Sequence, residues 1–254
     1  EGGRAAKGRA IVNLIGCEPD EKVSAFIGVK QDQFHDDHFV VMATEKGIVK
    51  KTKLSAYSNP RKKGIYAVEI RDGDSLIEAR VSNGENDILL GTTNGKSIRF
   101  SEEQIRPSGR KTMGVKGITL SSSDDKVVGM LLIKREGTVL VATENGFGKR
   151  TEIIQYRAQK RGGKGVLTMK TTDKIGKMIT IKEVVGTDDL MIIRDDGVLI
   201  RMPVSQIRSI GRATQGVKLI KLAEGTKVSA ITRIISEEEK TTDEPKDSPE
   251  SQES

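Results

Sequence analysis

The sequence has 254 residues, of which 35% are apolar, 31% charged and only 3% aromatic. Its net charge is +7, and no apolar run approaches the length needed to cross a bilayer, which excludes a membrane-spanning helix. The single cysteine, Cys17, excludes an internal disulfide framework and is typical of a reducing, cytoplasmic compartment. Trp is absent, so Val, Ile, Leu, Met and Ala must build the core, and short β-branched runs favour strands over helices.

The first predicted element is a strand that follows a glycine and a group of cations. It reads "RAAKGRAIVNL" at the start of the chain, and an apolar or alternating run follows the glycine in every copy. Four of the five copies have Arg four residues before this glycine. The copies are Arg4–Leu14, Pro60–Ile70, Arg110–Leu120, Arg161–Thr171 and Arg212–Leu222. Because the opening "EGGRAAKGRA" resembles this internal motif and lacks the apolar centre of a signal peptide, we expect the chain to begin inside a larger protein.

The second predicted element is another strand, which follows each copy of the first. Its first copy reads "EKVSAFIGV", and the other copies are similar apolar runs with few turn residues. The segments are Glu21–Val29, Asp74–Val81, Asp125–Ile133, Gly176–Val184 and Thr226–Ile234.

The third predicted element is a β-hairpin, in which an apolar run, a polar turn ending in Gly and a cation-terminated run follow one another. The four hairpins are Val40–Thr52, Ile88–Phe100, Val139–Thr151 and Leu190–Met202, with turn glycines Gly47, Gly95, Gly146 and Gly197. Three of the turns are Asn-Gly or Asp-Gly, the dipeptides that type I′ turns prefer because both turn positions need positive φ.

These elements form a unit of about 50 residues with about four strands and no convincing helix. A small sheet cannot bury both faces alone, so the sequence predicts an all-β, propeller-like disc of four-stranded blades over residues 1–235, with about four to five blades. An open sandwich of hairpins is the alternative. The stretch 236–254 carries eight acidic and two basic residues, which leaves +13 on residues 1–235, and its composition predicts a disordered acidic tail.

Cations recur at matching places in the repeats. We expect them to form a basic rim that contacts the phosphates of double-stranded DNA, which carries one charge per about 1.7 Å of its axis. The predicted rim consists of Arg4, Lys50, Lys51, Arg61, Lys62, Lys63, Arg99, Arg110, Lys149, Arg150, Arg201 and Arg212. The loop "QKRGGKG" adds three cations on a glycine-rich backbone whose N–H groups can approach phosphates closely.

This loop carries a family resemblance. Gln159, Lys160, Arg161, Gly162, Gly163, Lys164 and Gly165 match every position of the gyrase A box, Q-(R/K)-R-G-G-(R/K)-G. The stretches "ENGFGKRT", "GRKTMGVKGI" and "GRATQGV" also resemble the C-terminal domain of the DNA gyrase A protein. The resemblance implies a β-pinwheel, whose blades exchange strands and whose basic perimeter wraps DNA so that the holoenzyme introduces negative supercoils. The box stands in the penultimate repeat rather than the first. We therefore expect a chain that lacks its first blade and a ring that need not close; the alternative is that the box has moved.

The resemblance also implies what the chain does not do. It is not itself an enzyme, because the catalytic tyrosine domain of the type IIA topoisomerases is absent and none of Tyr57, Tyr66 and Tyr156 matches the nucleophile. It would hold no cofactor, since ATP and Mg belong to other domains of the holoenzyme. Its implied partners are double-stranded DNA, the rest of the gyrase A protein and, through it, the gyrase B protein, with no membrane partner.

Three other interpretations stay open on the sequence alone. The chain could be the equivalent domain of topoisomerase IV, which would bend DNA without full wrapping. It could be a propeller-type scaffold for protein partners, or a self-contained enzyme, although no acid, base or nucleophile constellation supports an enzyme. "FHDDH" places His35 and His38 beside two aspartates, but a polar loop without a distant ligand set argues against a metal site. The acidic tail could solubilise the chain or compete with DNA for the rim.

Overall fold

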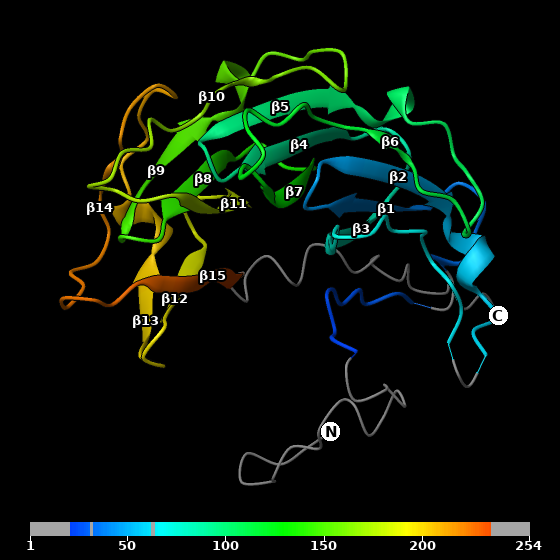
Figure 1. Ribbon diagram of the computed structural model, residues 1–254, viewed down its shortest axis with the longest axis horizontal. Helices are drawn as coiled ribbons and strands as arrows, with labels where there is room; N and C mark the ends of the chain where they lie inside the picture. The colour runs from blue at the N-terminus through cyan, green and yellow to red at the C-terminus, as the bar shows by residue number, and fades with distance from the viewer. Residues whose placement is uncertain (1–20, 31–32, 62–63, 235–254) are drawn as a thin grey trace, which may run out of the picture. The chain divides into compact units, whose positions relative to one another are not determined.

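A computed structural model of the chain describes residues 21–30, 33–61 and 64–234. Throughout these residues the secondary structure consists of strands and short 3-10 turns, without an α-helix, so the predicted all-β fold is confirmed (Figure 1). The first strand motif, Cys17 and the acidic tail lie outside the described residues.

All four predicted hairpins are present. In each, two antiparallel strands are paired over five residues. The first strand is largely buried in the first three hairpins and only partly buried in the fourth. The hairpins are β1 (Phe39–Thr44) with β2 (Ile48–Lys53), β4 (Asp87–Thr92) with β5 (Lys96–Ser101), β8 (Thr138–Thr143) with β9 (Phe147–Glu152), and β12 (Asp189–Arg194) with β13 (Leu199–Pro203).

The turn type predicted for these hairpins is wrong. Only the glycine of each turn has positive φ, with 81° at Gly47 and 78° at Gly146, and the residue before it does not. In the first hairpin the Gly47 N–H donates to the Thr44 carbonyl at 3.0 Å, and Ala43 pairs with Val49. This geometry is a type I turn followed by a left-handed glycine, the usual three-residue hairpin loop.

The second predicted element forms a strand in four of its five copies. Each strand pairs antiparallel with the first strand of the preceding hairpin, and the register shifts by one residue near the hairpin turn in every case. These strands are β3 (Leu76–Ser82), β7 (Val127–Ile133), β11 (Met178–Val184) and β15 (Val228–Ile234).

After Gly114, Gly165 and Gly216 a short strand joins a hairpin far upstream in the chain. Val115 pairs with Val49, Val166 with Ser97 and Val217 with Gly148, so the partner lies 66 or 69 residues earlier in the chain. Figure 1 shows each of these strands beside the outer strand of its hairpin. The three exchanged strands are β6 (Val115–Lys116), β10 (Val166–Leu167) and β14 (Val217–Lys218), and they confirm the expected strand exchange.

The described strands therefore make four sheets, with strand orders β3-β1-β2-β6, β10-β5-β4-β7, β11-β8-β9-β14 and β13-β12-β15. Two predicted strands, Glu21–Val29 and the run after Gly64, have no strand assignment. Among the described residues no hairpin strand pairs with either segment, and a strand forms only where its backbone joins such a hydrogen-bond ladder. In the first segment, Ala25, Ile27 and Val29 instead pack against a core cluster that includes Val40 and Ala79.

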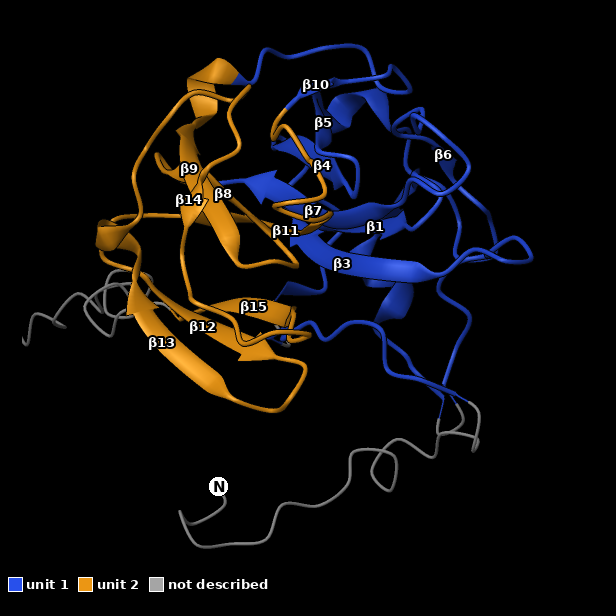
Figure 2. Ribbon diagram, turned by 60° about the vertical axis from the view of Figure 1, so that its left-hand side comes forward, with its two compact units in different colours: residues 1–134, 156–167 blue, residues 135–155, 168–254 orange. Residues whose placement is uncertain are grey.

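The chain divides into two compact units (Figure 2). Unit 1 holds residues up to 134 together with 156–167, and therefore β1–β7 and β10. One of its cores gathers β-strand side chains such as Val41, Leu90 and Met130. Unit 2 holds the remaining residues, with a core that includes Leu140 and Ile192. Closure of a ring and a single domain over 1–235 stay predictions.

Candidate nucleic-acid interface

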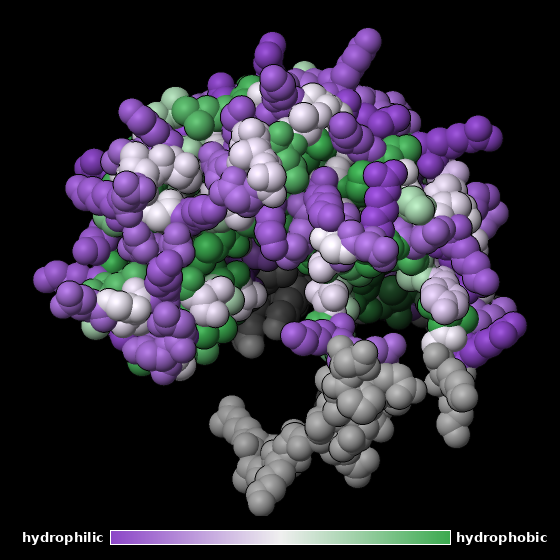
Figure 3. Space-filling model, viewed as in Figure 1, coloured by the Kyte–Doolittle hydropathy of each residue, from purple (hydrophilic) through white to green (hydrophobic). Residues whose placement is uncertain are grey.

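Three loops of eleven residues each lead into the exchanged strands, and we call them straps. They are Arg106–Lys116, Arg157–Leu167, which contains the gyrase A box, and Arg208–Lys218. The straps contain eleven Lys and Arg residues and no Asp or Glu, an imbalance that the chain as a whole does not have. Eight of these cations are exposed: Arg106, Lys111, Lys116, Arg157, Lys160, Lys164, Arg208 and Lys218. Figure 3 shows long hydrophilic side chains projecting beside β5 and β10.

Each strap is fixed at its end by a glycine that touches the hairpin backbone. Gly165 has a φ of 68°, and a Cβ built on it would lie 2.3 Å from the Ser97 carbonyl oxygen. Gly114 and Gly216 lie similarly close to the Val49 and Gly148 carbonyl oxygens. The motif glycine therefore allows the exchanged strand to approach the hairpin, which differs from the role near phosphates that the sequence indicated for Gly165.

The box residues divide into exposed and inward-facing groups. Lys160 and Lys164 are exposed, whereas Arg161 is only partly so. The Gln159 N–H donates to the Arg99 carbonyl at 2.8 Å, and its side-chain Nε2 is buried without a hydrogen bond to any described residue. Gly162 also has positive φ, at 80°, in the turn that follows Arg161. The two lysines are thus the box side chains that a polyanion can reach.

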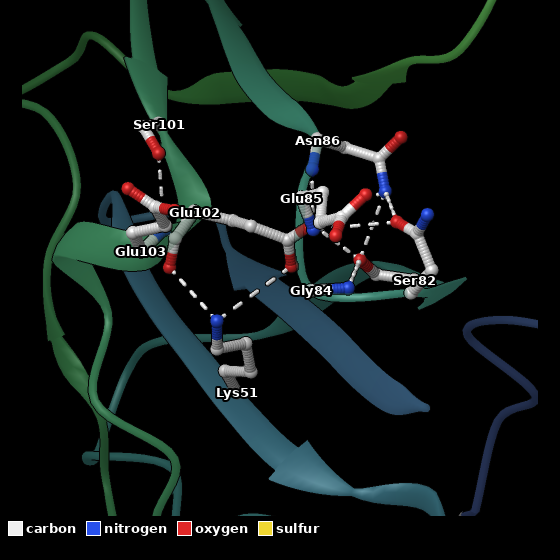
Figure 4. Close-up of polar contacts among 9 residues, drawn as sticks. Lys51, Ser82, Gly84, Glu85, Asn86, Ser101, Glu102 and Glu103 are labelled. Carbon is white, nitrogen blue, oxygen red and sulfur yellow. Dashed lines mark hydrogen bonds and ion pairs between the residues drawn. The ribbon is translucent and has the colours of Figure 1, made fainter. Parts of the chain in front are cut away.

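Three predicted rim lysines are buried, and the prediction that they line an exposed rim is wrong. Lys50 and Lys149 are 1% and 0% exposed, and Lys51 is 4% exposed. Each donates to main-chain carbonyls, Lys51 to that of Glu102 at 3.0 Å (Figure 4). A lysine at the end of a strand looks solvated in the sequence, but here its ammonium group satisfies carbonyls that would otherwise be buried without a partner.

Lys50 and Lys149 hold two of the straps through the strap backbone. The Lys50 ammonium donates to the Arg110 carbonyl and, at 2.9 Å, to the Ala67 carbonyl. The Lys149 ammonium donates to the carbonyls of Gly211, at 2.7 Å, and Arg212. Burial lowers the pKa of both lysines to about 8, and the nearby Arg212 charge adds to the effect at Lys149.

The other predicted rim residues differ in how far their side chains are exposed and in whether they already contact other protein groups. Arg99 lies 2.7 Å from Asp87, the Arg150 Nε donates to the Ile207 carbonyl at 2.8 Å, and Arg201 pairs with Asp189. Arg110 and Arg212 are half-buried, and Arg61 is exposed. Arg4, Lys62 and Lys63 lie outside the described residues.

Sequence reasoning missed one repeated cation. Arg106, Arg157 and Arg208 open the three straps at intervals of 51 residues, and all three are exposed. The interval equals that of the motif glycines, so alignment of the straps on Gly114, Gly165 and Gly216 would have revealed them. They are better placed for a polyanion than the buried lysines are.

Other kinds of site find little support in the part of the chain that the structure describes. Those residues contain no group of three or more His, Cys, Asp or Glu that could hold a metal ion, and His38 pairs with the adjacent Asp37, at 2.9 Å. Among the same residues, no helix is long and apolar enough to cross a membrane. Tyr156 is 1% exposed and belongs to the core.

The fold and the straps define a class: all-β repeat proteins of the propeller type, whose sheets exchange strands and whose connecting loops are basic. The sequence matches the family described as "DNA gyrase C-terminal domain, beta-propeller" over residues 38–83, 86–134, 137–184 and 188–234. The chain belongs to this family.

Curated relatives and solved structures agree with that assignment. The chain is 43% identical to the A subunit of DNA gyrase from Staphylococcus aureus (strain NCTC 8325 / PS 47), over 95% of this chain and 27% of that protein. It resembles the crystal structure of the C-terminal domain of DNA topoisomerase IV, with a TM-score of 0.82, 23% identity and coverage of 89% of this chain and 70% of that one. A DNA gyrase A C-terminal domain structure gives a TM-score of 0.80 at 21% identity, covering 91% and 76%. The chain spans about a quarter of the curated relatives it matches.

Proposed function

We propose that this chain is a non-catalytic module that binds double-stranded DNA through the exposed cations of its straps and bends the duplex around them. The proposal rests on eight exposed cations on three straps that contain no Asp or Glu. Three of these cations, Arg106, Arg157 and Arg208, recur at the 51-residue interval of the repeat. Regularly spaced cations without competing carboxylates suit a polymer of phosphates, and contacts of this kind read the backbone rather than the bases.

Family membership and the intact box support a more specific role. We propose that the bent duplex is wrapped, and that wrapping allows a gyrase holoenzyme to introduce negative supercoils. In that setting the partners are the remainder of the gyrase A protein and, through it, the gyrase B protein, in the cytoplasm. The chain itself is proposed to need no cofactor, and ATP and Mg would serve other domains.

A second candidate is the DNA-bending role of the equivalent topoisomerase IV domain, which has the same fold as this chain, as the gyrase A domain does at a similar TM-score. The two candidates differ in topology. A bending module leaves the linking number of a closed plasmid nearly unchanged, whereas a wrapping module shifts it.

The test of DNA binding is the salt dependence of duplex affinity, measured with the full chain by fluorescence anisotropy. If all eight exposed cations contact phosphates, log K should fall against log salt with a slope of about −7, since each neutralised phosphate contributes about −0.9. A slope near zero would instead favour a scaffold for protein partners. A matched variant in which Lys30 and Lys174, exposed cations outside the straps, are changed to Ala should keep the wild-type slope.

A further inference from the structure

The side chains of Gln104 and Arg161 hold the box loop, Gln159–Gly165, in place through hydrogen bonds. The Gln104 side chain donates from Nε2 to the Gln159 carbonyl at 3.2 Å and accepts at Oε1 from the Arg161 N–H at 2.9 Å. The Arg161 guanidinium returns the contact, because its Nε donates to the Gln104 carbonyl at 2.9 Å and its Nη1 to the Lys116 carbonyl at 3.1 Å. Each of these two side chains therefore fixes the backbone of the other.

A second set of contacts holds the next residues of the loop. The Gly162 N–H donates to the Gly117 carbonyl at 2.6 Å. Thr119 donates twice, from its hydroxyl to the Gly162 carbonyl at 2.6 Å and from its N–H to the Gly163 carbonyl at 2.9 Å. Gly117 and Thr119 belong to unit 1, as the box loop does. The backbone groups of Gly162 and Gly163 are therefore hydrogen-bonded within a single unit.

The other two straps are held differently. Lys50 and Lys149 donate to their carbonyls from the hairpin, but the matching position beside the box is Ile98, which is fully buried. Arg161 occupies the strap position of Arg110 and Arg212, and its guanidinium donates to two main-chain carbonyls. The two carbonyls accept from different nitrogens of the guanidinium, Nε and Nη1, an arrangement that the single nitrogen of a lysine cannot reproduce.

We infer that Arg161, Gln104 and Thr119 are positioning residues that preorganise the box, while Lys160 and Lys164 contact the phosphates. The inference rests on the proposed function, in which the box binds duplex DNA. A loop that is already ordered loses little conformational freedom when DNA binds, so these hydrogen bonds raise affinity without adding a phosphate contact. Arg161 thus contributes to DNA binding by ordering the box loop, and not by contacting the DNA itself.

The salt slope separates the two roles, because it counts neutralised phosphates and is insensitive to loop ordering. We would measure duplex binding by the full chain in about 50 to 200 mM salt. Lys160→Ala and Lys164→Ala should each reduce the slope by about 0.9. Arg161→Gln, Gln104→Ala and Thr119→Val should keep the wild-type slope and weaken binding by about tenfold, as expected when a preorganised loop is loosened.

Two comparisons keep the test independent of folding. Thr119→Ser retains the hydroxyl and should bind as the wild type does, whereas Thr119→Val should not. Gln104 is exposed, so its replacement by Ala should leave the thermal unfolding midpoint unchanged. The inference is overturned if Gln104→Ala and Thr119→Val bind as the wild type does, or if Arg161→Gln reduces the slope by about 0.9, as the lysine changes should. If Lys160→Ala and Lys164→Ala also change nothing, the box does not bind DNA, and the proposed function fails together with the inference.

Discussion

The ammonium group of Lys51 lies 3.8 Å from the Oε2 atom of Glu102, and both side chains are buried, at 5% and 0% exposure. Lys51 belongs to β2 and Glu102 opens the 3-10 turn after β5, so the pair joins two sheets of unit 1 (Figure 4). The other carboxylate oxygen accepts from the Ser82 hydroxyl and from the Asn86 N–H, the latter at 2.6 Å. One carboxylate thereby ties three segments together.

This pair is specific to one repeat. The residues that stand 51 and 102 positions after Glu102 are Ile153 and Val204, and Val204 is a core residue of unit 2. A buried charge is tolerated only with its partners in place, so we expect Glu102→Ala and Lys51→Met each to lower the free energy of unfolding by about 3–5 kcal/mol. Urea denaturation would measure the loss.

The double variant Lys51→Met with Glu102→Gln provides the control. With no unpaired charge left, it should be more stable than Lys51→Met alone. Losses below about 1 kcal/mol in the single variants would place the pair among weak surface ion pairs and contradict its role as a tie between sheets.

The buried hairpin lysines that hold the straps, Lys50 and Lys149, predict an unusual pH dependence. The pKa of Lys149 is about 8 in the folded chain and 10.5 ordinarily, so between these values the folded state binds fewer protons than the unfolded state. The free energy of unfolding should therefore rise with pH across that window, by about 1.4 kcal/mol per pH unit for this lysine. In Lys149→Met the contribution should vanish. Identical pH slopes for the two proteins in urea denaturation would show that the ammonium keeps its ordinary pKa.

Gly165 should be intolerant of a side chain. Its left-handed φ strains any other residue, and the added Cβ would meet the Ser97 carbonyl oxygen at 2.3 Å, so β10 would have to leave β5. We expect Gly165→Ala to lower the free energy of unfolding by about 2 kcal/mol or more. Gly109→Ala, at a glycine with open space around its Cβ position, should be nearly neutral in the same assay. Equal effects of the two changes would contradict the packing explanation.

The strap-opening arginines should count as phosphate contacts. The triple variant Arg106→Ala, Arg157→Ala and Arg208→Ala should reduce the salt slope of duplex binding by about 2.7, or 0.9 for each contact. A triple variant at exposed lysines outside the straps, Lys22, Lys30 and Lys174, removes the same charge and should leave the slope unchanged. Equal reductions in both variants would mean that net charge, and not the straps, attracts the DNA.

The local elements of this fold can be predicted from the sequence better than their pairing. Apolar alternation around Gly47, Gly95, Gly146 and Gly197 is sufficient to predict all four hairpins, because strand and turn lie within a dozen residues. The predicted turn type is wrong, since Asn-Gly also suits a type I turn with a left-handed glycine. Whether a strand forms after a motif glycine depends on a hairpin 66 or 69 residues upstream, and no local pattern reports such a distance.

The candidate site can be predicted only in part for a similar reason. Lys160 and Lys164 are identified by the box, and both are exposed. Lys50 is misplaced because a cation beside a strand end looks solvated, although the equivalent position in the second hairpin is Ile98, which indicates burial. The inward contacts of Arg161 depend on Gln104 and Lys116, about 50 residues away, so only the folded chain reveals them.

The most direct test of DNA wrapping is the linking number of a closed plasmid relaxed in the presence of the full chain. We predict a shift that grows with the amount of bound chain and is absent in the Lys160→Ala, Lys164→Ala double variant at equal occupancy. An unchanged linking-number distribution at saturating wild-type chain would contradict wrapping.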